Sequence, residues 1–105
     1  MAYTCRWKGA SDKEYIYIIN PIEDNTWDDV PGNYIFARES EPNKWAAIYI
    51  GETESFKDLI PNHNELPCIR RNKCTHVHTH INLTSQARLA EEKDLLANHT
   101  TPCND

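Results

Sequence analysis

Two short segments rich in aromatic and β-branched residues constrain the fold of this chain more than any other feature. They span residues 33–38 and 45–51, and only the polar segment 39–44 lies between them. Residues of these types favour extended strands, and two strands with a short connection pair as an antiparallel hairpin. We therefore predict a β-hairpin with a long tip over residues 39–44.

Side chains alternate between the two faces of a strand, which sorts the residues of this hairpin. Tyr34, Phe36 and Arg38 are predicted to share one face of the first strand. Ala47 and Tyr49 are predicted to share one face of the second strand. Strand tyrosines are most often packing residues, so the alternation alone assigns them no chemistry.

The rest of the chain supplies further strands and helices. Residues 14–19 predict a strand that pairs with residues 3–8, and residues 21–32 predict a loop with Trp27 folded over the core. Ser55 is predicted to cap a short helix that ends at Pro61, followed by a second helix over residues 64–72. A strand over 74–81 and a helix over 86–97 complete the pattern.

These elements predict an α+β fold in which a small antiparallel sheet is flanked by helices. A chain of 105 residues has room for one hydrophobic core. We therefore interpret residues 1–31 as an added strand or hairpin of the same domain that residues 32–105 form.

The chain carries no apolar stretch typical of a secretory signal or a membrane span, so we expect a cytoplasmic protein without a membrane partner. In that compartment Cys5, Cys68, Cys74 and Cys103 are expected to stay reduced, and no Cys-x-x-Cys pair suggests structural zinc.

The charge distribution is uneven. The net charge of −5 argues against a general nucleic-acid binder, because affinity for a phosphate backbone comes largely from Lys and Arg. Residues 57–88 nevertheless form a locally basic stretch that could face a phosphate chain, although such stretches are more often solvated surface.

The last predicted helix holds two adjacent carboxylates. On a helical wheel Leu89, Leu95 and Leu96 define an apolar arc, with Glu92 near its middle and Glu91 at its edge. An inward carboxylate needs a cation, a metal ion or hydrogen-bond donors. Two explanations stay open: an ion pair with Arg38 or Arg88, or a ligand for Mg²⁺.

The triplet Gly32-Asn33-Tyr34, followed after a spacer by Tyr49-Ile50-Gly51, resembles the paired signature of the GIY-YIG nuclease superfamily. Asn33 stands in place of the usual isoleucine. The closing part is also similar to that family, and the likeness covers residues 32–104 through Glu92, Leu95, Leu96, Pro102 and Asn104.

This resemblance implies a three-stranded antiparallel sheet with helices and a Mg²⁺- or Mn²⁺-dependent endonuclease that hydrolyses phosphodiesters, with DNA favoured over RNA. Tyr34 would act as general base or orient the attacking water, Tyr49 would bind the phosphate, Glu92 would hold the metal and Asn104 would brace the site. Gly32 and Gly51 are the motif glycines. Candidate phosphate contacts elsewhere are Lys57, Arg38, Arg70, Arg71, His63 and His76.

One departure from the family weakens the expected activity. The family places an arginine eight residues after the second motif glycine, and this position is Leu59 here. Two alternatives therefore stand beside the nuclease hypothesis. The first is an inactive binding module on a nuclease scaffold, and the second is a metal-binding domain built on the alternating His76, His78 and His80.

Overall fold

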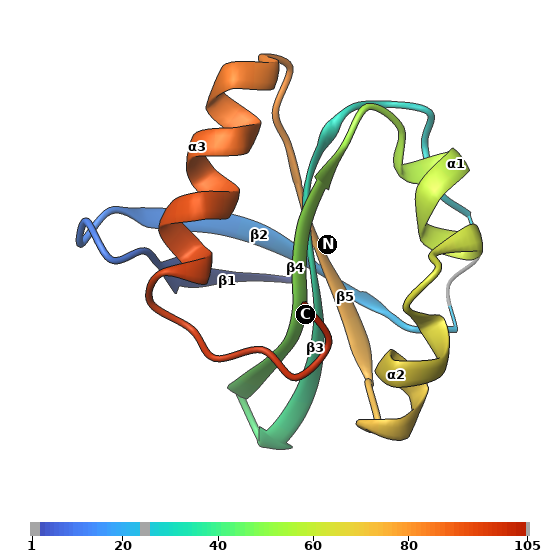
Figure 1. Ribbon diagram of the computed structural model, residues 1–105. Coiled ribbons are helices and arrows are strands. Elements are labelled where there is room, and N and C mark those ends of the chain that lie inside the picture. The colour runs from blue at the N-terminus through green and yellow to red at the C-terminus, as the bar shows by residue number, and fades with distance from the viewer. Residues whose placement is uncertain (1–2, 24–25, 105) are drawn as a thin grey trace.

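The computed structural model describes residues 3–23 and 26–104, which form a five-stranded antiparallel sheet with helices on both faces. The strand order is β1-β2-β5-β3-β4. The helix α3 lies on one side of the sheet, and α1 and α2 lie on the other (Figure 1). This arrangement confirms the predicted α+β class. The bounds are β1 (Thr4–Lys8), β2 (Glu14–Pro21), β3 (Gly32–Glu41), β4 (Lys44–Thr53), α1 (Phe56–Leu59), the 3-10 turn η1 (Ile60–Asn62), α2 (Leu66–Arg71), β5 (His76–Ile81) and α3 (Ser85–Leu96).

The amino-terminal hairpin extends the sheet instead of forming a separate layer. The strand β1 pairs with β2 as predicted, and β2 pairs in turn with β5. The strands β4, β3 and β5 make the other part of the sheet, with β4 at its edge.

The hairpin of β3 and β4 is longer than predicted, and its tip is shorter. Pairing continues to Glu41 and Lys44, so only Pro42 and Asn43 form the turn. Asn43 has a φ of 65°, a left-handed conformation that asparagine tolerates better than most residues. The predicted long tip is wrong because the polar residues on either side of the turn continue the ladder.

An irregularity in this hairpin changes which residues share a face. Phe36 pairs with Tyr49, but the next residue of β3, Ala37, pairs with Ala47, so Ile48 is the extra residue of a bulge. Tyr49 packs against the core below α1 and α2, whereas Ala47 packs against the core below α3. The prediction that Ala47 and Tyr49 share a face is therefore wrong.

Each face of the sheet has its own hydrophobic core. The strand β5 alternates as predicted, with Val77 in the core below α1 and α2 and His78 buried on the face toward α3. Trp27 packs at the margin of the first core, as predicted. Ser55 caps α1 as predicted, since its hydroxyl accepts a hydrogen bond from the backbone N–H of Asp58.

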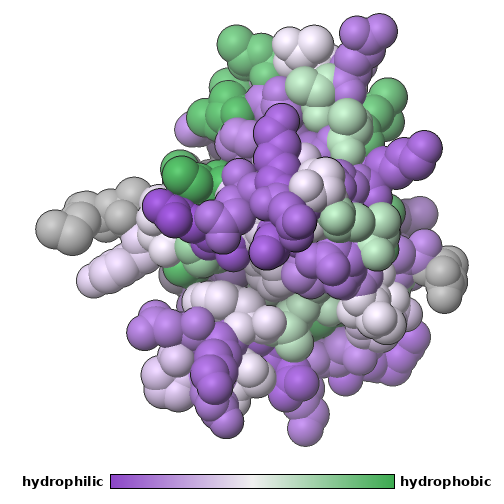
Figure 2. All heavy atoms as spheres, turned by 90° about the vertical axis from the view of Figure 1, so that its left-hand side faces the viewer, coloured by the Kyte–Doolittle hydropathy of each residue, from purple (hydrophilic) through white to green (hydrophobic). Residues whose placement is uncertain are grey.

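The helix α3 buries a different face from the one predicted. Arg88, Glu91 and Leu95 are buried, whereas Leu89 is 53% exposed. Glu91 is thus the more deeply buried of the two glutamates, and Glu92 is half-buried. The prediction was wrong because the sheet opposite α3 offers polar partners, so the apolar arc does not mark the inward side. The outer surface over α3 is mostly hydrophilic (Figure 2).

The carboxyl-terminal segment packs against the edge strand β4. The backbone N–H of Cys103 donates to the carbonyl of Ile48, and the side-chain amide of Asn104 makes paired hydrogen bonds of 2.9 and 2.8 Å with the backbone of Ile50. These contacts confirm that residues 102–104 pack on the body of the domain.

Cys103 also forms a disulfide with Cys68 in α2. The prediction that all four cysteines are thiols is therefore wrong, and only Cys5 and Cys74 are free. A bond between residues 35 positions apart leaves no signature in sequence spacing.

Candidate functional site

The two signature tyrosines lie side by side on the face of the sheet toward α1 and α2. Tyr34 comes from β3 and Tyr49 from β4, and their rings are nearly parallel with centroids 6.0 Å apart. Tyr34 is only 2% exposed, whereas Tyr49 is half-buried. A ligand that approaches this surface therefore meets Tyr49 first. We call Tyr34, Tyr49, His63 and Glu92 the tyrosine cluster.

The buried ring of His63 joins the tyrosines from the loop after η1. Its Nδ1 accepts a hydrogen bond of 3.0 Å from the backbone N–H of Glu65, so the proton of the neutral ring belongs on Nε2. Nε2 lies 2.9 Å from the Tyr34 hydroxyl oxygen. His63 therefore donates to Tyr34, and its ring also meets the ring of Tyr49 edge-to-face at 4.5 Å. Sequence reasoning listed His63 only as a phosphate contact.

Tyr34 is a proton donor in the resting protein. Burial raises the pKa of its phenol, and the neighbouring Tyr49 and Glu92 raise it further. Its oxygen accepts the N–H of His63, and a hydrogen bond with Tyr49 raises the pKa of Tyr34 and lowers that of Tyr49, so the Tyr34 hydroxyl donates to Tyr49. A raised pKa favours the role of orienting water or phosphate over the role of general base.

Glu92 lacks the partners that its neighbour Glu91 has. Burial raises the pKa of the half-buried Glu92 carboxyl, and Glu52 raises it further. Among residues 3–23 and 26–104, no cation pairs with Glu92 and no donor bonds it. Arg88, one expected partner, instead bonds Glu52 at 2.9 Å. The charge of Glu92 raises the pKa of both Tyr34 and Tyr49.

The Glu92 carboxylate is one ligand of the type that a hard divalent cation takes. Mg²⁺ takes oxygen ligands, is commonly held by one or two carboxylates, and keeps several waters. Glu92 supplies an unpaired carboxylate, and Glu52 stands near enough to influence its pKa. Residues 3–23 and 26–104 contain no group of three or more His, Cys, Asp or Glu side chains arranged for a metal ion.

The two motif glycines are required by packing. A Cβ at Gly51 would collide with the hydroxyl end of Tyr34, and a Cβ at Gly32 would collide with the carbonyl of His80 and the ring of Phe56. Gly51 therefore makes room for the Tyr34 hydroxyl, and Gly32 lets β3 approach β5 and α1.

The carboxyl-terminal segment braces the strand that carries Tyr49. Cys103 and Asn104 bond the backbone of Ile48 and Ile50, the residues on either side of Tyr49. Asn104 thus acts on the cluster through the backbone of β4, and the disulfide of Cys103 fixes this contact to α2.

The predicted phosphate contacts other than His63 lie outside the contacts that define the cluster. Lys57 is exposed on α1, and His76 packs against Trp45 on the face toward α3. Arg38 and Arg71 line a second pocket beside β4. Arg70 lines an apolar cavity of about 220 Å³.

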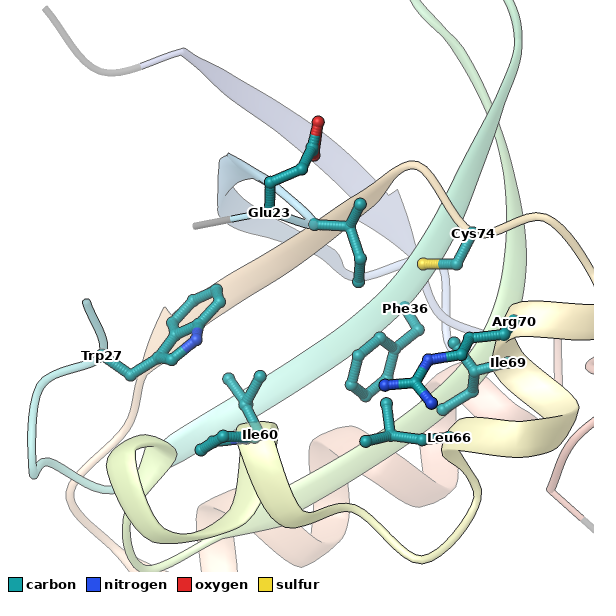
Figure 3. Close-up of a pocket in the computed structure, with 10 residues that line it drawn as sticks. Glu23, Trp27, Phe36, Ile60, Leu66, Ile69, Arg70 and Cys74 are labelled. Atoms are coloured by element: carbon teal, nitrogen blue, oxygen red, sulfur yellow. The ribbon is translucent and has the colours of Figure 1, made fainter. Parts of the chain in front are cut away.

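That apolar cavity lies between the loop after β2, the turn η1 and the helix α2. Figure 3 shows Phe36, Ile60 and Leu66 around it, with the guanidinium of Arg70 directed inward and the carboxylate of Glu23 directed away. Its walls are mainly hydrocarbon, and no group of three metal-ligating side chains occurs among the described residues that line it.

Leu59 remains an apolar residue at the position where the resembled family has arginine. It is half-buried and packs at the margin of the core that contains Tyr34. Position 59 is therefore partly open, as expected, but it is also in contact with the core.

The three strand histidines have separate partners. His78 is fully buried, and its Nδ1 accepts a hydrogen bond of 2.9 Å from the indole N–H of Trp7. His80 bonds Glu91 at 2.9 Å, and His76 bonds the hydroxyl of Thr75. Glu91 also accepts a hydrogen bond from the buried Tyr17. Sequence reasoning missed this network because its members are far apart in the chain.

Comparison of the chain with protein-family models, with curated proteins and with solved structures finds no match. Within the described ranges, no helix is both long enough and apolar enough to cross a membrane.

Proposed function

We propose that this protein is a Mg²⁺- or Mn²⁺-dependent endonuclease that hydrolyses phosphodiester bonds in nucleic acid, with DNA as the expected substrate. The observation that carries the proposal is Glu92. It is a half-buried carboxylate with a raised pKa and no protein partner among the described residues, and its charge raises the pKa of the Tyr34 and Tyr49 phenols. An unpaired carboxylate in such a place is costly unless a cation binds it.

Each residue of the cluster has a role in this proposal. Glu92 would hold the divalent ion, which supplies Lewis-acid stabilisation of charge on the phosphate. The more accessible Tyr49 hydroxyl donates to a non-bridging phosphate oxygen. Tyr34 orients the attacking water or, through its hydrogen bond with Tyr49, the hydroxyl that meets the phosphate. His63 keeps the Tyr34 oxygen oriented through its Nε2–H, because its Nδ1 is occupied by Glu65.

Two features favour slow turnover. Leu59 leaves the cluster without the arginine that the resembled family uses, and loss of a comparable preorganised donor costs about 10²–10³ in rate. The raised pKa of Tyr34 also makes it a poor base in the resting protein. These features support the second candidate, a nucleic-acid binding module without turnover.

The compartment in which the protein works is a separate question. The disulfide between Cys68 and Cys103 is typical of oxidising compartments, which weighs against the expected cytoplasmic location.

The deciding experiment is cleavage of single-stranded, double-stranded and branched DNA by purified protein with Mg²⁺ or Mn²⁺. We expect slow cleavage that EDTA and Glu92→Ala abolish. Glu14→Ala, an exchange of an exposed carboxylate on β2 outside the cluster, serves as the control and should retain activity. Cleavage that survives Glu92→Ala would assign the nuclease to a contaminant or to another site. Metal-independent DNA binding without cleavage would favour the binding module.

A further inference from the structure

A second pocket gathers positive charge beside β4. It has a volume of about 340 Å³ and lies between the β3–β4 hairpin, the residues after α2 and the carboxyl-terminal segment. Arg38, Arg71 and Lys73 line it, and all three residues are exposed. We call this site the basic pocket.

The three cations of the basic pocket have no protein partner. Within residues 3–23 and 26–104, no carboxylate lies within ion-pair distance of any of them, and none makes a side-chain hydrogen bond. By contrast, Arg6, Lys8, Lys44 and Arg88 each pair with a carboxylate. Three unpaired cations stand together on a chain whose net charge is −5. Their mutual repulsion is relieved when an anion with several charges binds.

The walls of the pocket are fixed before any ligand arrives. Thr100 and Pro102 form one wall, and the disulfide between Cys68 and Cys103 ties that segment to α2. The side-chain amide of Asn72 also donates to the carbonyl of Cys68 at 2.9 Å. A preorganised site loses little conformational entropy when it binds a ligand.

We propose that the basic pocket binds the phosphodiester backbone of a nucleic-acid strand that extends from the tyrosine cluster. This inference rests on the proposed function for the position of the scissile bond. Guanidinium groups match phosphate oxygens in pairs, and a nucleic-acid backbone presents closely spaced negative charges. Inorganic phosphate offers the same chemistry without the chain, and an acidic protein offers carboxylates instead.

The distance between the two sites fits one continuous strand. Ala46, Ala47 and Ile48 line the basic pocket, and Tyr49 is the next residue of β4. From Ala46 to Tyr49 a regular strand advances about 10 Å, and the bulge at Ile48 shortens this advance. A B-DNA strand advances about 3.4 Å for each nucleotide, so a few nucleotides of one strand span both sites.

The test measures binding of a fluorescein-labelled single-stranded oligonucleotide and a duplex by fluorescence anisotropy in EDTA, where no cleavage occurs. The pocket variant combines Arg38→Gln, Arg71→Gln and Lys73→Gln. The control combines Lys8→Gln, Lys13→Gln and Lys93→Gln, which are exposed residues that change the net charge equally. Because every substituted residue is exposed, both variants should keep the thermal stability of the wild type, which a melting curve checks.

We expect the pocket variant to bind nucleic acid at least about tenfold more weakly and to lose about two to three from the slope of log K against log salt. The control should bind within about twofold of the wild type. If both variants lost affinity equally, the effect would come from the net charge alone, and the proposal that the basic pocket is a binding site would be wrong. No loss in the pocket variant would also overturn it.

Competition experiments identify which class of anion the basic pocket binds. Unlabelled DNA should displace the probe, whereas inorganic phosphate and polyglutamate at equal charge should not. Displacement by inorganic phosphate alone would assign the pocket to a small anion, and displacement by polyglutamate would assign it to an acidic protein; either overturns the proposal. Binding is measured in EDTA and cleavage with Mg²⁺, so a failed cleavage assay and a failed pocket remain distinguishable.

Discussion

Two regions of this protein bury ionisable side chains, and they differ in whether the glutamate in each region has hydrogen-bond partners. In the network toward α3, Glu91 is 3% exposed and accepts hydrogen bonds from Tyr17 and His80. In the tyrosine cluster, its sequence neighbour Glu92 is half-buried and has no partner among the described residues. The comparison separates a carboxylate that holds the fold together from one that is available to a ligand.

The largest expected effect tests whether Glu91 stabilises the fold. Glu91→Ala leaves the Tyr17 hydroxyl and His80 without their acceptor, both beneath α3. We expect the free energy of unfolding to fall by about 3–5 kcal/mol, as for other broken buried pairs. Urea denaturation at neutral pH measures this loss. A loss below about 1 kcal/mol would show that the network contributes little to stability.

The second prediction concerns the segment that braces the tyrosine cluster. Cys103→Ser removes a disulfide that closes a loop of 35 residues, which should cost about 3–4 kcal/mol of stability. Thermal melting of the variant, and of the wild type in dithiothreitol, measures the effect. Cys74→Ser provides the matched control, because Cys74 is a free thiol. If dithiothreitol changes the wild type no more than it changes Cys103→Ser, the disulfide has no part in stability.

The third prediction is a pH dependence from His78. Burial, together with the charge of His76, lowers the pKa of His78 to about 3. The unfolded chain therefore binds a proton below its ordinary pKa of about 6.5 that the folded chain does not. Stability from this residue is present above that value and falls as the pH falls, by about 2 kcal/mol between pH 6.5 and pH 5.

Urea denaturation across this pH range should show a smaller slope for His78→Phe than for the wild type. The variant keeps an aromatic ring between Trp7 and Trp45 but has no titrating group there. Since burial also lowers the pKa of His63, part of the slope should persist in the variant. An unchanged slope would mean that His78 takes up a proton in the folded protein.

The fourth prediction returns to the tyrosine cluster at Leu59. The half-buried Leu59→Arg variant can keep its hydrocarbon stem against the core and its guanidinium in water, so we expect a loss of about 1 kcal/mol. Mg²⁺-dependent cleavage should rise, and Leu59→Lys should raise it less because it lacks the planar fork. A well-folded Leu59→Arg protein that stays inert would favour the binding module.

The sequence predicted the elements better than their contacts. Aromatic and β-branched runs located the strands, and Ser55 located the start of α1, because these are local preferences. The bulge at Ile48 and the disulfide of Cys103 depend on partners distant in the chain. No periodic pattern reports such partners.

The candidate site was only partly predicted, because some of its contacts also join residues that are distant in the chain. The resemblance selected Tyr34 and Tyr49, and the bulge at Ile48, which alternation does not predict, puts Tyr49 on the face that Tyr34 occupies. His63 lies in a loop, where no periodicity marks a buried ring. The helical wheel chose Glu92 over Glu91 because it weighed leucines alone, whereas the sheet opposite α3 attracts polar residues.

The last prediction has the smallest expected change in stability, and it tests most directly whether Glu92 differs from Glu91 in its structural role. Glu92→Ala removes a half-buried carboxylate whose pKa is raised by burial and by Glu52, so no favourable protein contact is lost. Alanine is also slightly the better helix former. We therefore expect the free energy of unfolding to stay within about 1 kcal/mol of the wild type or to rise, in contrast to Glu91→Ala. Added Mg²⁺ or Mn²⁺ should raise the melting temperature of the wild type but not of Glu92→Ala, because an ion that binds only the folded state stabilises it. A destabilisation as large as that of Glu91→Ala would make Glu92 a structural residue, and the metal site would then have to be sought elsewhere.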